Sequence, residues 1–325
     1  VYHQLGLVAQ EQRQFNDASA FYRKALKIRE DAGDWHSAAS DYHQIGIVAQ
    51  KQRQFDDASA FYHKALKIYE DAEDWHSAAS DYHQLGRVAQ EQRQFDDASA
   101  FYRHAMKIYE VAGDWHSAAR EYHQLGTVAQ KHRQFDDAIA FHNQALKIYE
   151  DAEDWHSVAG DYHNLGVIAQ EQRCFDDASA FYLKSLKIFE DAGDLYNASY
   201  QYQQLGVIAK EQGNFESAVT YFQKAFTARS AANDWLQVSS TLIAWGQTWE
   251  IQKNWTEAVK IYIQALAVDL EHNQECVGSD VKNLGRMLKA LGVRQFEAIW
   301  REVTDLELTE EWRSAIVSAS TQKEG

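Results

Sequence analysis

The sequence repeats itself every 40 residues, and this periodicity limits the folds open to the chain more than any other feature. Residues 42–81 and 82–121 are identical at 30 of 40 positions. Further copies start at Tyr2, Tyr122 and Tyr162, and more divergent ones at Tyr202 and Leu242. A fixed period of this length indicates stacked units that bury their apolar faces against their neighbours. We therefore expect one continuous array, although a length of 325 residues would otherwise suggest two globular domains.

Each repeat contains two segments with the apolar spacing of an amphipathic helix, at about 35–52 and 57–72 in one copy. We expect Asp34 to cap the first helix and Asp56 to cap the second, because carboxylates accept hydrogen bonds from the free amides of helix N-termini. Gly33 predicts a left-handed cap at the end of the preceding helix. Since the chain contains no proline, nothing interrupts these helices, and the sequence predicts an all-α stack of antiparallel helix pairs.

One set of small, aliphatic and aromatic residues recurs at fixed spacing, with substitutions in some copies. In one repeat the set is Tyr42, Ile45, Gly46, Ala49, Ala58, Tyr62 and Ala65. This pattern resembles the tetratricopeptide repeat, and the resemblance covers residues 2 to about 270. The repeats here are longer than the usual ~34 residues, and Glu70 stands where that family often has proline. The 40-residue variety is similar to repeats of spindle-orientation adaptors and of bacterial signalling proteins.

The resemblance implies a right-handed superhelical solenoid of about seven antiparallel helix pairs, with the first helices lining a concave groove. We expect the array to occupy residues 1–279, with repeats starting near 2, 42, 82, 122, 162, 202 and 242. Residues 280–319 are expected to form C-terminal capping helices, because polar residues such as Glu310 and Arg313 break the apolar pattern there. Residues 320–325 are expected to be a frayed tail. Because Val1 begins within a helical pattern, we also expect a preceding helix or domain.

Composition excludes several classes of function. The net charge of −16 argues against a large surface for nucleic-acid phosphates, and much of it is explained by acidic residues at helix starts. No apolar run approaches the ~20 residues that a membrane-spanning helix needs. Cys174 and Cys276 lie in different repeats, which is typical of a reducing compartment rather than a disulfide framework. We therefore expect a cytoplasmic protein that binds neither membrane nor nucleic acid.

The residues opposite the core stripe of the first helix would line the groove. In one copy they are His36, Ser40, His43, Ile47, Gln50, Lys51 and Gln54. Several of these positions vary between copies; Ile47, for example, is replaced by Arg87 and Thr127. Drift is the alternative explanation, because the outward face of the second helix varies as well. We predict that the groove binds a protein or peptide, through side chains taken from the middle repeats: His43, His83, Gln84, Arg87, Gln90, Arg120, His123, Thr127, Gln130, Lys131 and His163.

The recurring histidines raise the alternatives of metal binding and catalysis. Neither a cysteine nor a carboxylate recurs on the same stripe to complete a tetrahedral ligand set. No arrangement of Ser, His and Asp, or of Cys and His, suggests a nucleophile with its base. We therefore predict no metal, no cofactor and no catalytic residue, and expect the histidines to hydrogen-bond their neighbours or a ligand.

These observations predict a non-enzymatic binding scaffold that is the recognition region of a larger protein. The alternative is a sensor or regulatory arm of a bacterial signalling ATPase or a protease-type effector whose catalytic domain lies outside this sequence. Residues 280–319 are also similar to the end of the repeat region in such ATPases. Self-association, or docking to another domain of the same protein, is a third way in which the array could be used.

Overall fold

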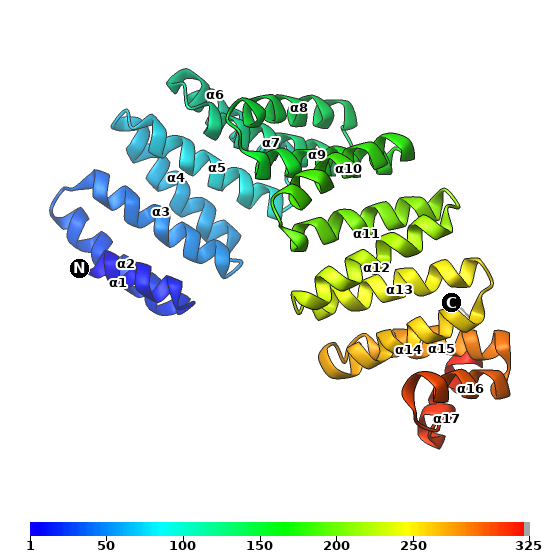
Figure 1. Cartoon of the computed structure of the whole chain (residues 1–325). Helices are drawn as coiled ribbons and strands as arrows, with labels where there is room; N and C mark the ends of the chain where they lie inside the picture. The colour runs from blue at the N-terminus through cyan, green and yellow to red at the C-terminus, as the bar shows by residue number, and fades with distance from the viewer. Residues whose placement is uncertain (322–325) are drawn as a thin grey trace. The chain divides into compact units, whose positions relative to one another are not determined.

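Helices account for most of residues 1–321, the part of the chain that this computed structural model describes (Figure 1). Their bounds are α1 (Tyr2–Glu11), α2 (Phe15–Asp31), α3 (Trp35–Lys51), α4 (Phe55–Asp71), α5 (Trp75–Glu91), α6 (Phe95–Ala112), α7 (Trp115–Lys131), α8 (Phe135–Asp151), α9 (Trp155–Glu171), α10 (Phe175–Asp191), α11 (Leu195–Glu211), α12 (Phe215–Ala231), α13 (Trp235–Ile251), α14 (Trp255–His272), α15 (Val277–Leu291), α16 (Val293–Thr304) and α17 (Glu310–Thr321). The chain divides into two compact units, unit 1 (Val1–Asn164) and unit 2 (Leu165–Gly325).

Within each unit, helices that follow one another in the sequence pack together. In unit 1 this holds for every successive pair from α1 to α8, and in unit 2 for every successive pair from α10 to α16. Links as short as residues 52–54 turn each helix back along its predecessor (Figure 1). The expected all-α architecture of stacked antiparallel helix pairs is confirmed. The odd-numbered helices up to α13 are the first helices of their repeats, and the even-numbered ones up to α14 are the second helices.

The helix ends follow from the sequence at most, but not all, positions. Asp34 caps α3, as predicted, by accepting a hydrogen bond of 3.2 Å from the Ser37 amide. Gly33 has the predicted left-handed conformation, with φ of 71°. The prediction that Asp56 caps the second helix is wrong, because α4 begins one residue earlier, at Phe55, and its N-cap residue Gln54 makes no side-chain cap bond. Asp56 instead lies in the first turn, where its charge complements the helix dipole.

A glycine on each first helix lets an aromatic ring of the second helix approach closely. Tyr62 is completely buried, and a Cβ atom added to Gly46 would lie 2.7 Å from the Cε1 atom of Tyr62. No side chain fits at that distance, so the close approach of α3 and α4 requires glycine. The Tyr62 hydroxyl also donates a 3.1 Å hydrogen bond to Oε1 of Gln50, so the buried ring keeps a polar partner.

The last three helices, α15, α16 and α17, do not form another repeat pair but pack as a small cluster on α14. α15 and α16 both pack against α14, and α17 packs against α15. Their shared core includes the buried side chains of Phe296, Ile299, Trp300 and Ile316. Residues 322–325, which belong to the segment expected to fray, lie outside the described residues. None of the helices between residues 1 and 321 is long and apolar enough to cross a membrane.

Candidate functional site

A pocket lined mainly by polar and charged residues lies between the first helices of two successive repeats in unit 1. It has a volume of about 480 Å³, and its lining comes from α3, α5 and the link after α3: Ile47, Gln50, Lys51, Arg53, Gln84, Arg87 and Glu91. We call it the α3–α5 pocket. Among its lining residues, Gln84 and Arg87 belong to the predicted site, and Ile47, Gln50 and Lys51 to the predicted groove face. Glu91 has the groove position of Lys51 in the next repeat, and Arg53 was not assigned to the groove.

The position of Arg53 follows from local backbone geometry. The residue has φ of 61°, which places it in the left-handed region directly after α3. Arginine recurs at this position in Arg13, Arg93, Arg133 and Arg173, each with positive φ. A cation at the end of a helix complements the negative end of its dipole. The recurrence of arginine after five of the first helices was the available signal for this part of the pocket.

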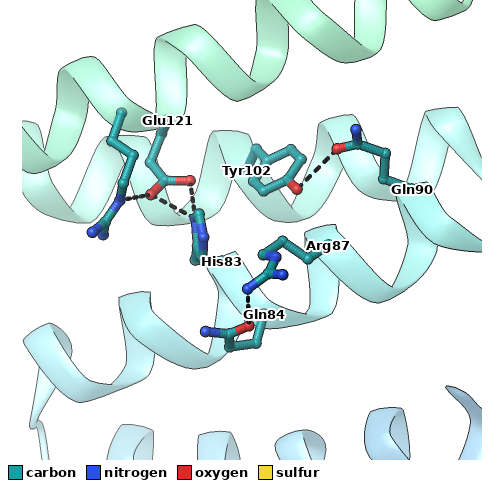
Figure 2. A network of polar contacts seen from close by, with 7 residues as sticks. His83, Gln84, Arg87, Gln90, Tyr102 and Glu121 are labelled. Carbon is teal, nitrogen blue, oxygen red and sulfur yellow. Dashed lines mark hydrogen bonds and ion pairs between the residues drawn. The ribbon is translucent and has the colours of Figure 1, made fainter. Parts of the chain in front are cut away.

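Hydrogen bonds hold the floor of the pocket in place. Gln50 is buried, and its Nε2 donates to Oε1 of Glu91 over 2.8 Å while its Oε1 accepts from Tyr62 of the second helix. Gln84 and Arg87 lie one turn apart on α5, and Nη1 of Arg87 donates to Oε1 of Gln84 over 3.4 Å (Figure 2). Arg87 remains exposed. The pocket thus has a fixed floor and a cationic side chain that is free to meet a ligand.

The charge of the pocket differs from that of the chain. Lys51, Arg53 and Arg87 contribute three positive charges, and Glu91 contributes one negative charge, which already accepts the hydrogen bond from Gln50. The whole chain, by contrast, carries a net charge of −16. A local excess of cations in a recess favours an anionic group, such as a carboxylate, over a cationic or apolar one.

Three histidines of the predicted site, His43, His83 and His123, are bound to buried carboxylates of the next repeat. Nδ1 of His43 lies 2.6 Å from Oδ1 of Asp81, and Nδ1 of His83 lies 2.9 Å from both carboxylate oxygens of Glu121 (Figure 2). The side chains of His43 and His83 are only 17% and 12% exposed, and both carboxylates are fully buried. These histidines therefore hold successive first helices together and offer little surface to a ligand.

Each of these histidines also contacts the second helix of its own repeat. The ring of His43 lies edge-on to Tyr62 and that of His83 is tilted against Tyr102, with centroids 5.7 and 5.6 Å apart. Burial raises the pKa of Asp81 above its ordinary value, although the hydrogen bond from His43 lowers it in part. The prediction that no carboxylate accompanies the histidine stripe is wrong. The carboxylate comes from the next repeat, and the recurrence of an acid at Asp41, Asp81, Glu121 and Asp161 was the available signal.

The other predicted site residues lie on the first helices but are not brought into the α3–α5 pocket. Gln90 accepts a 3.1 Å hydrogen bond from the Tyr102 hydroxyl (Figure 2). Arg120 is 48% exposed and lies 3.4 Å from Glu121. Oγ1 of Thr127 donates to the carbonyl of His123 on the same helix over 3.1 Å.

The remaining three differ in burial. Lys131 is exposed at the end of α7, while Gln130 and His163 are partly buried. Their role in binding stays a prediction, as it does for every residue of the set.

The comparisons with known proteins agree with the repeat pattern. Among solved structures, the apo form of RapI has a TM-score of 0.62 at 17% identity and covers 87% of this chain and 97% of its own. Aspartyl phosphate phosphatase F from Bacillus subtilis has a TM-score of 0.61 at 18% identity, covering 82% and 69%. These identities establish similarity of fold only.

A third solved structure matches nearly the whole chain. It is a Signal Transduction ATPase with Numerous Domains from Pyrococcus horikoshii that has a tetratricopeptide repeat sensor. Its TM-score is 0.67 at 15% identity, and the match covers 98% of this chain and 48% of that protein. No curated protein sequence matches the chain significantly.

The sequence profile of the tetratricopeptide repeat family matches residues 1–71, 76–151 and 159–231, which together make up more than half of the chain. No catalytic family is indicated. The matched segments contain the helix pairs, the close glycine–tyrosine contacts and the α3–α5 pocket described above. The chain therefore belongs to the tetratricopeptide repeat family.

Proposed function

We propose that the chain is a non-enzymatic protein-binding module whose first helices in unit 1 accept an acidic peptide segment. The observation that carries this proposal is the α3–α5 pocket, which concentrates Lys51, Arg53 and Arg87 in an otherwise acidic chain. An aspartate or glutamate of the partner would enter the pocket and exchange its hydration for charge-assisted hydrogen bonds. Because hydrogen bonds already fix the floor of the pocket, little ordering of the protein is needed on binding.

The spacing of the first helices suits an extended peptide. Packed helices lie about 10 Å apart, and an extended chain advances about 3.3 Å per residue, so every third residue of a peptide can meet a new first helix. Lys51 on α3, Arg87 on α5 and Lys131 on α7 supply exposed cations on three successive first helices. A peptide with an acidic residue at every third position matches this arrangement, whereas a peptide of evenly spaced basic residues is repelled.

The test is a direct binding measurement with a defined peptide. A fluorescein-labelled 12-residue peptide with glutamate at every third position is titrated with the protein, and fluorescence anisotropy is compared with that of the same peptide carrying glutamine. We expect saturable binding of the glutamate peptide only. Each exchange of a pocket cation for glutamate should lower the affinity for this peptide by at least ~10-fold, because it replaces an attraction by a repulsion. The variant Lys51→Glu/Arg87→Glu should therefore bind far more weakly.

A matched control separates the pocket from the overall charge. Lys67→Glu/Lys107→Glu makes the same change in net charge, but its exposed lysines lie on the second helices α4 and α6. This variant should bind the glutamate peptide almost as well as the unaltered protein. If both variants lost the same affinity for the peptide, only the total charge of the protein would matter, and the pocket would have no specific role.

A second candidate function is that of a sensor arm. The observation in its favour is that a structure with a tetratricopeptide repeat sensor matches 98% of this chain, while the matched part makes up 48% of that protein. We infer that the chain could serve a signalling ATPase or protease-type effector in this way, with a catalytic domain encoded elsewhere in the same gene. The coding sequence upstream of Val1 tests this: a nucleotide-binding or protease domain supports the sensor role.

We place the module in the cytoplasm. Cys174 and Cys276 are both free thiols, and Cys174 is exposed. An exposed free thiol persists most readily in a reducing compartment. Localisation of a fluorescently tagged protein in its native cell would test this assignment.

A further inference from the structure

One repeat of unit 1 contains a histidine where the others have an aromatic core residue. Tyr22, Tyr62, Tyr102 and Tyr182 occupy this position in other repeats, whereas α8 has His142 there. The His142 side chain is completely buried, and a Cβ atom added to Gly126 would lie 2.6 Å from its Nε2 atom. The substitution therefore places an ionisable nitrogen ligand in the core, at a position built for a phenol ring.

His142 shares a carboxylate with a second histidine. Nδ1 of His142 and Nδ1 of His123 each lie 2.7 Å from Oδ1 of Asp161. The two rings meet edge to face, with centroids 5.4 Å apart, and the three ligand atoms all lie within 4.8 Å of one another. Three consecutive helices, α7, α8 and α9, contribute one residue each.

This cluster differs from the histidine–carboxylate pairs of the neighbouring repeats. His43 with Asp81, and His83 with Glu121, each bring one imidazole to the buried acid, and a tyrosine stands in place of the second. Oδ2 of Asp161 is buried without a hydrogen-bond partner, as Oδ2 of Asp81 is in the His43 pair, and in the cluster Nε2 of His142 is also buried without one. Buried polar atoms without partners are costly, and a bound ion is one of the explanations for such an atom beside converging ligands.

Two imidazole nitrogens and a carboxylate oxygen are the donors that zinc and related divalent transition metals prefer. Such an ion binds these donors at about 2.0–2.2 Å, so tetrahedral ligands lie roughly 3.4 Å apart. Each histidine Nδ1 lies 2.7 Å from Oδ1 of Asp161, and side-chain shifts of less than ~1 Å would widen both distances to the roughly 3.4 Å between ligands of one ion. His123 is 30% exposed, which provides a path for the ion and leaves its fourth position open to water or to an oxygen of a partner.

We propose that His123, His142 and Asp161 bind one divalent transition-metal ion of the zinc class between α7, α8 and α9. The ion would replace two hydrogen bonds by metal–ligand bonds and so hold three successive helices together. The proposal concerns unit 1 alone and is independent of the α3–α5 pocket, which lies on other residues.

The experiment measures metal binding by protein that carries no affinity tag and has been stripped with chelator. Isothermal titration with Zn²⁺ gives the stoichiometry, and Co²⁺ absorption in the visible region reports tetrahedral coordination. We expect one strong site per chain and intense Co²⁺ bands. Zn²⁺ should also raise the melting temperature, because an ion that binds only the folded chain stabilises it.

Two substitutions exchange the residues of equivalent repeats. His142→Tyr introduces the residue found in most of the other repeats, so the fold should persist, as circular dichroism can verify. The strong site and the Co²⁺ bands should disappear. Tyr102→His should create a second site with His83 and Glu121 and raise the stoichiometry to two. Surface pairs of one histidine and one carboxylate, such as His116 with Asp154, bind metal only weakly. They are the same in both variants, so they do not affect the difference between them.

Two results would overturn the proposal. One is the absence of Co²⁺ bands and of a strong Zn²⁺ isotherm in the unaltered protein. The other is strong binding that survives in His142→Tyr. Either result would mean that the two histidines and Asp161 form a closed hydrogen-bonded core without an ion.

Discussion

The partner of a buried carboxylate determines what that residue does in this protein. Asp81 has His43 at 2.6 Å, and the hydrogen bond offsets part of the cost of burial. Asp280 precedes a Leu-Gly pair by the same spacing as Asp81 does. The equivalent of His43 in the preceding repeat is Ile243, which cannot donate a hydrogen bond to this carboxyl group. Both oxygens of Asp280 are buried without a hydrogen-bond partner. Burial, followed by the neighbouring Asp269, raises the pKa of Asp280 to about 8.

The raised pKa of Asp280 predicts a specific dependence of stability on pH. Because the folded chain holds this proton up to about pH 8 while the unfolded chain releases it near pH 4, the stability that it provides is present below about pH 4 and is lost as the pH rises to about 8. Asp280→Asn removes the ionisable group and keeps the shape. We expect it to raise the free energy of unfolding at pH 8 by about 1–3 kcal/mol, with little gain at pH 4.

Urea unfolding at pH 4, 6 and 8 would measure this difference. Glu275→Gln removes an exposed carboxylate nearby and serves as the control, for which we expect no pH-dependent gain. A gain for Asp280→Asn that is the same at all three pH values would contradict the assignment of the proton to Asp280.

At the scale of the helices, the two kinds of helix start differently. The first helices begin after an aspartate that accepts a hydrogen bond from a backbone amide, as Asp114 does from Ser117 over 3.1 Å. In unit 1 the second helices begin after a glutamine without such a bond, and their acids lie in the first turn. Hydrogen bonds with Ser117 lower the pKa of Asp114, so its contribution to stability is present above about pH 4 and is lost as the pH falls further.

This difference predicts that replacing two aspartates by alanine lowers the free energy of unfolding by unequal amounts. Asp114→Ala removes the cap of α7 and should cost about 1–2 kcal/mol of unfolding free energy at pH 7. Asp137→Ala removes only a charge in the first turn of α8 and should cost about 0.3–1 kcal/mol. Thermal or urea unfolding at pH 7 measures both. Equal losses would mean that charge alone, and not the amide hydrogen bond, stabilises these helix starts.

At the scale of the whole molecule, stability comes from contacts between neighbours in the sequence. In an array of repeats, each unit is stabilised by its own packing and by the interfaces to the units beside it. The hydrogen bond between His43 and Asp81 crosses such an interface, from α3 to α5. Similar bonds join His3 with Asp41 and His83 with Glu121 within unit 1.

Breaking one of these bonds should therefore weaken the coupling between repeats. His43→Leu leaves the fully buried Asp81 without its partner and should cost about 2–3 kcal/mol, because a buried charged group then lacks its hydrogen bond. The double variant His43→Leu/Asp81→Leu removes both polar groups and should be more stable than His43→Leu alone. Urea unfolding of the single and double variants checks this order. If the losses of unfolding free energy in His43→Leu and Asp81→Leu added up to the loss in the double variant, the two side chains would not depend on each other.

The sequence by itself determined the helices and the order in which they pack. Helix identity depends on local spacing, which the Ala, Tyr and Gly pattern of each copy displays, and the 40-residue period implies that neighbours in sequence are neighbours in space. The caps at Asp34 and Gly33 are local as well, and both predictions are confirmed. The cap of α4 was misplaced because an aspartate two residues into a helix has the same sequence signature as one just before it.

Only the tertiary structure decided which polar groups meet. His43 and Asp81 are 38 residues apart, and the distance between them depends on how far one repeat is displaced and turned relative to the next. The same displacement brings Lys51 and Arg87 to one pocket and His123 and His142 to one carboxylate. A repeating sequence shows that such residues recur, but the period carries no information on the angle between packed helices. That angle follows from the volumes of the buried side chains, which act together only in the folded core.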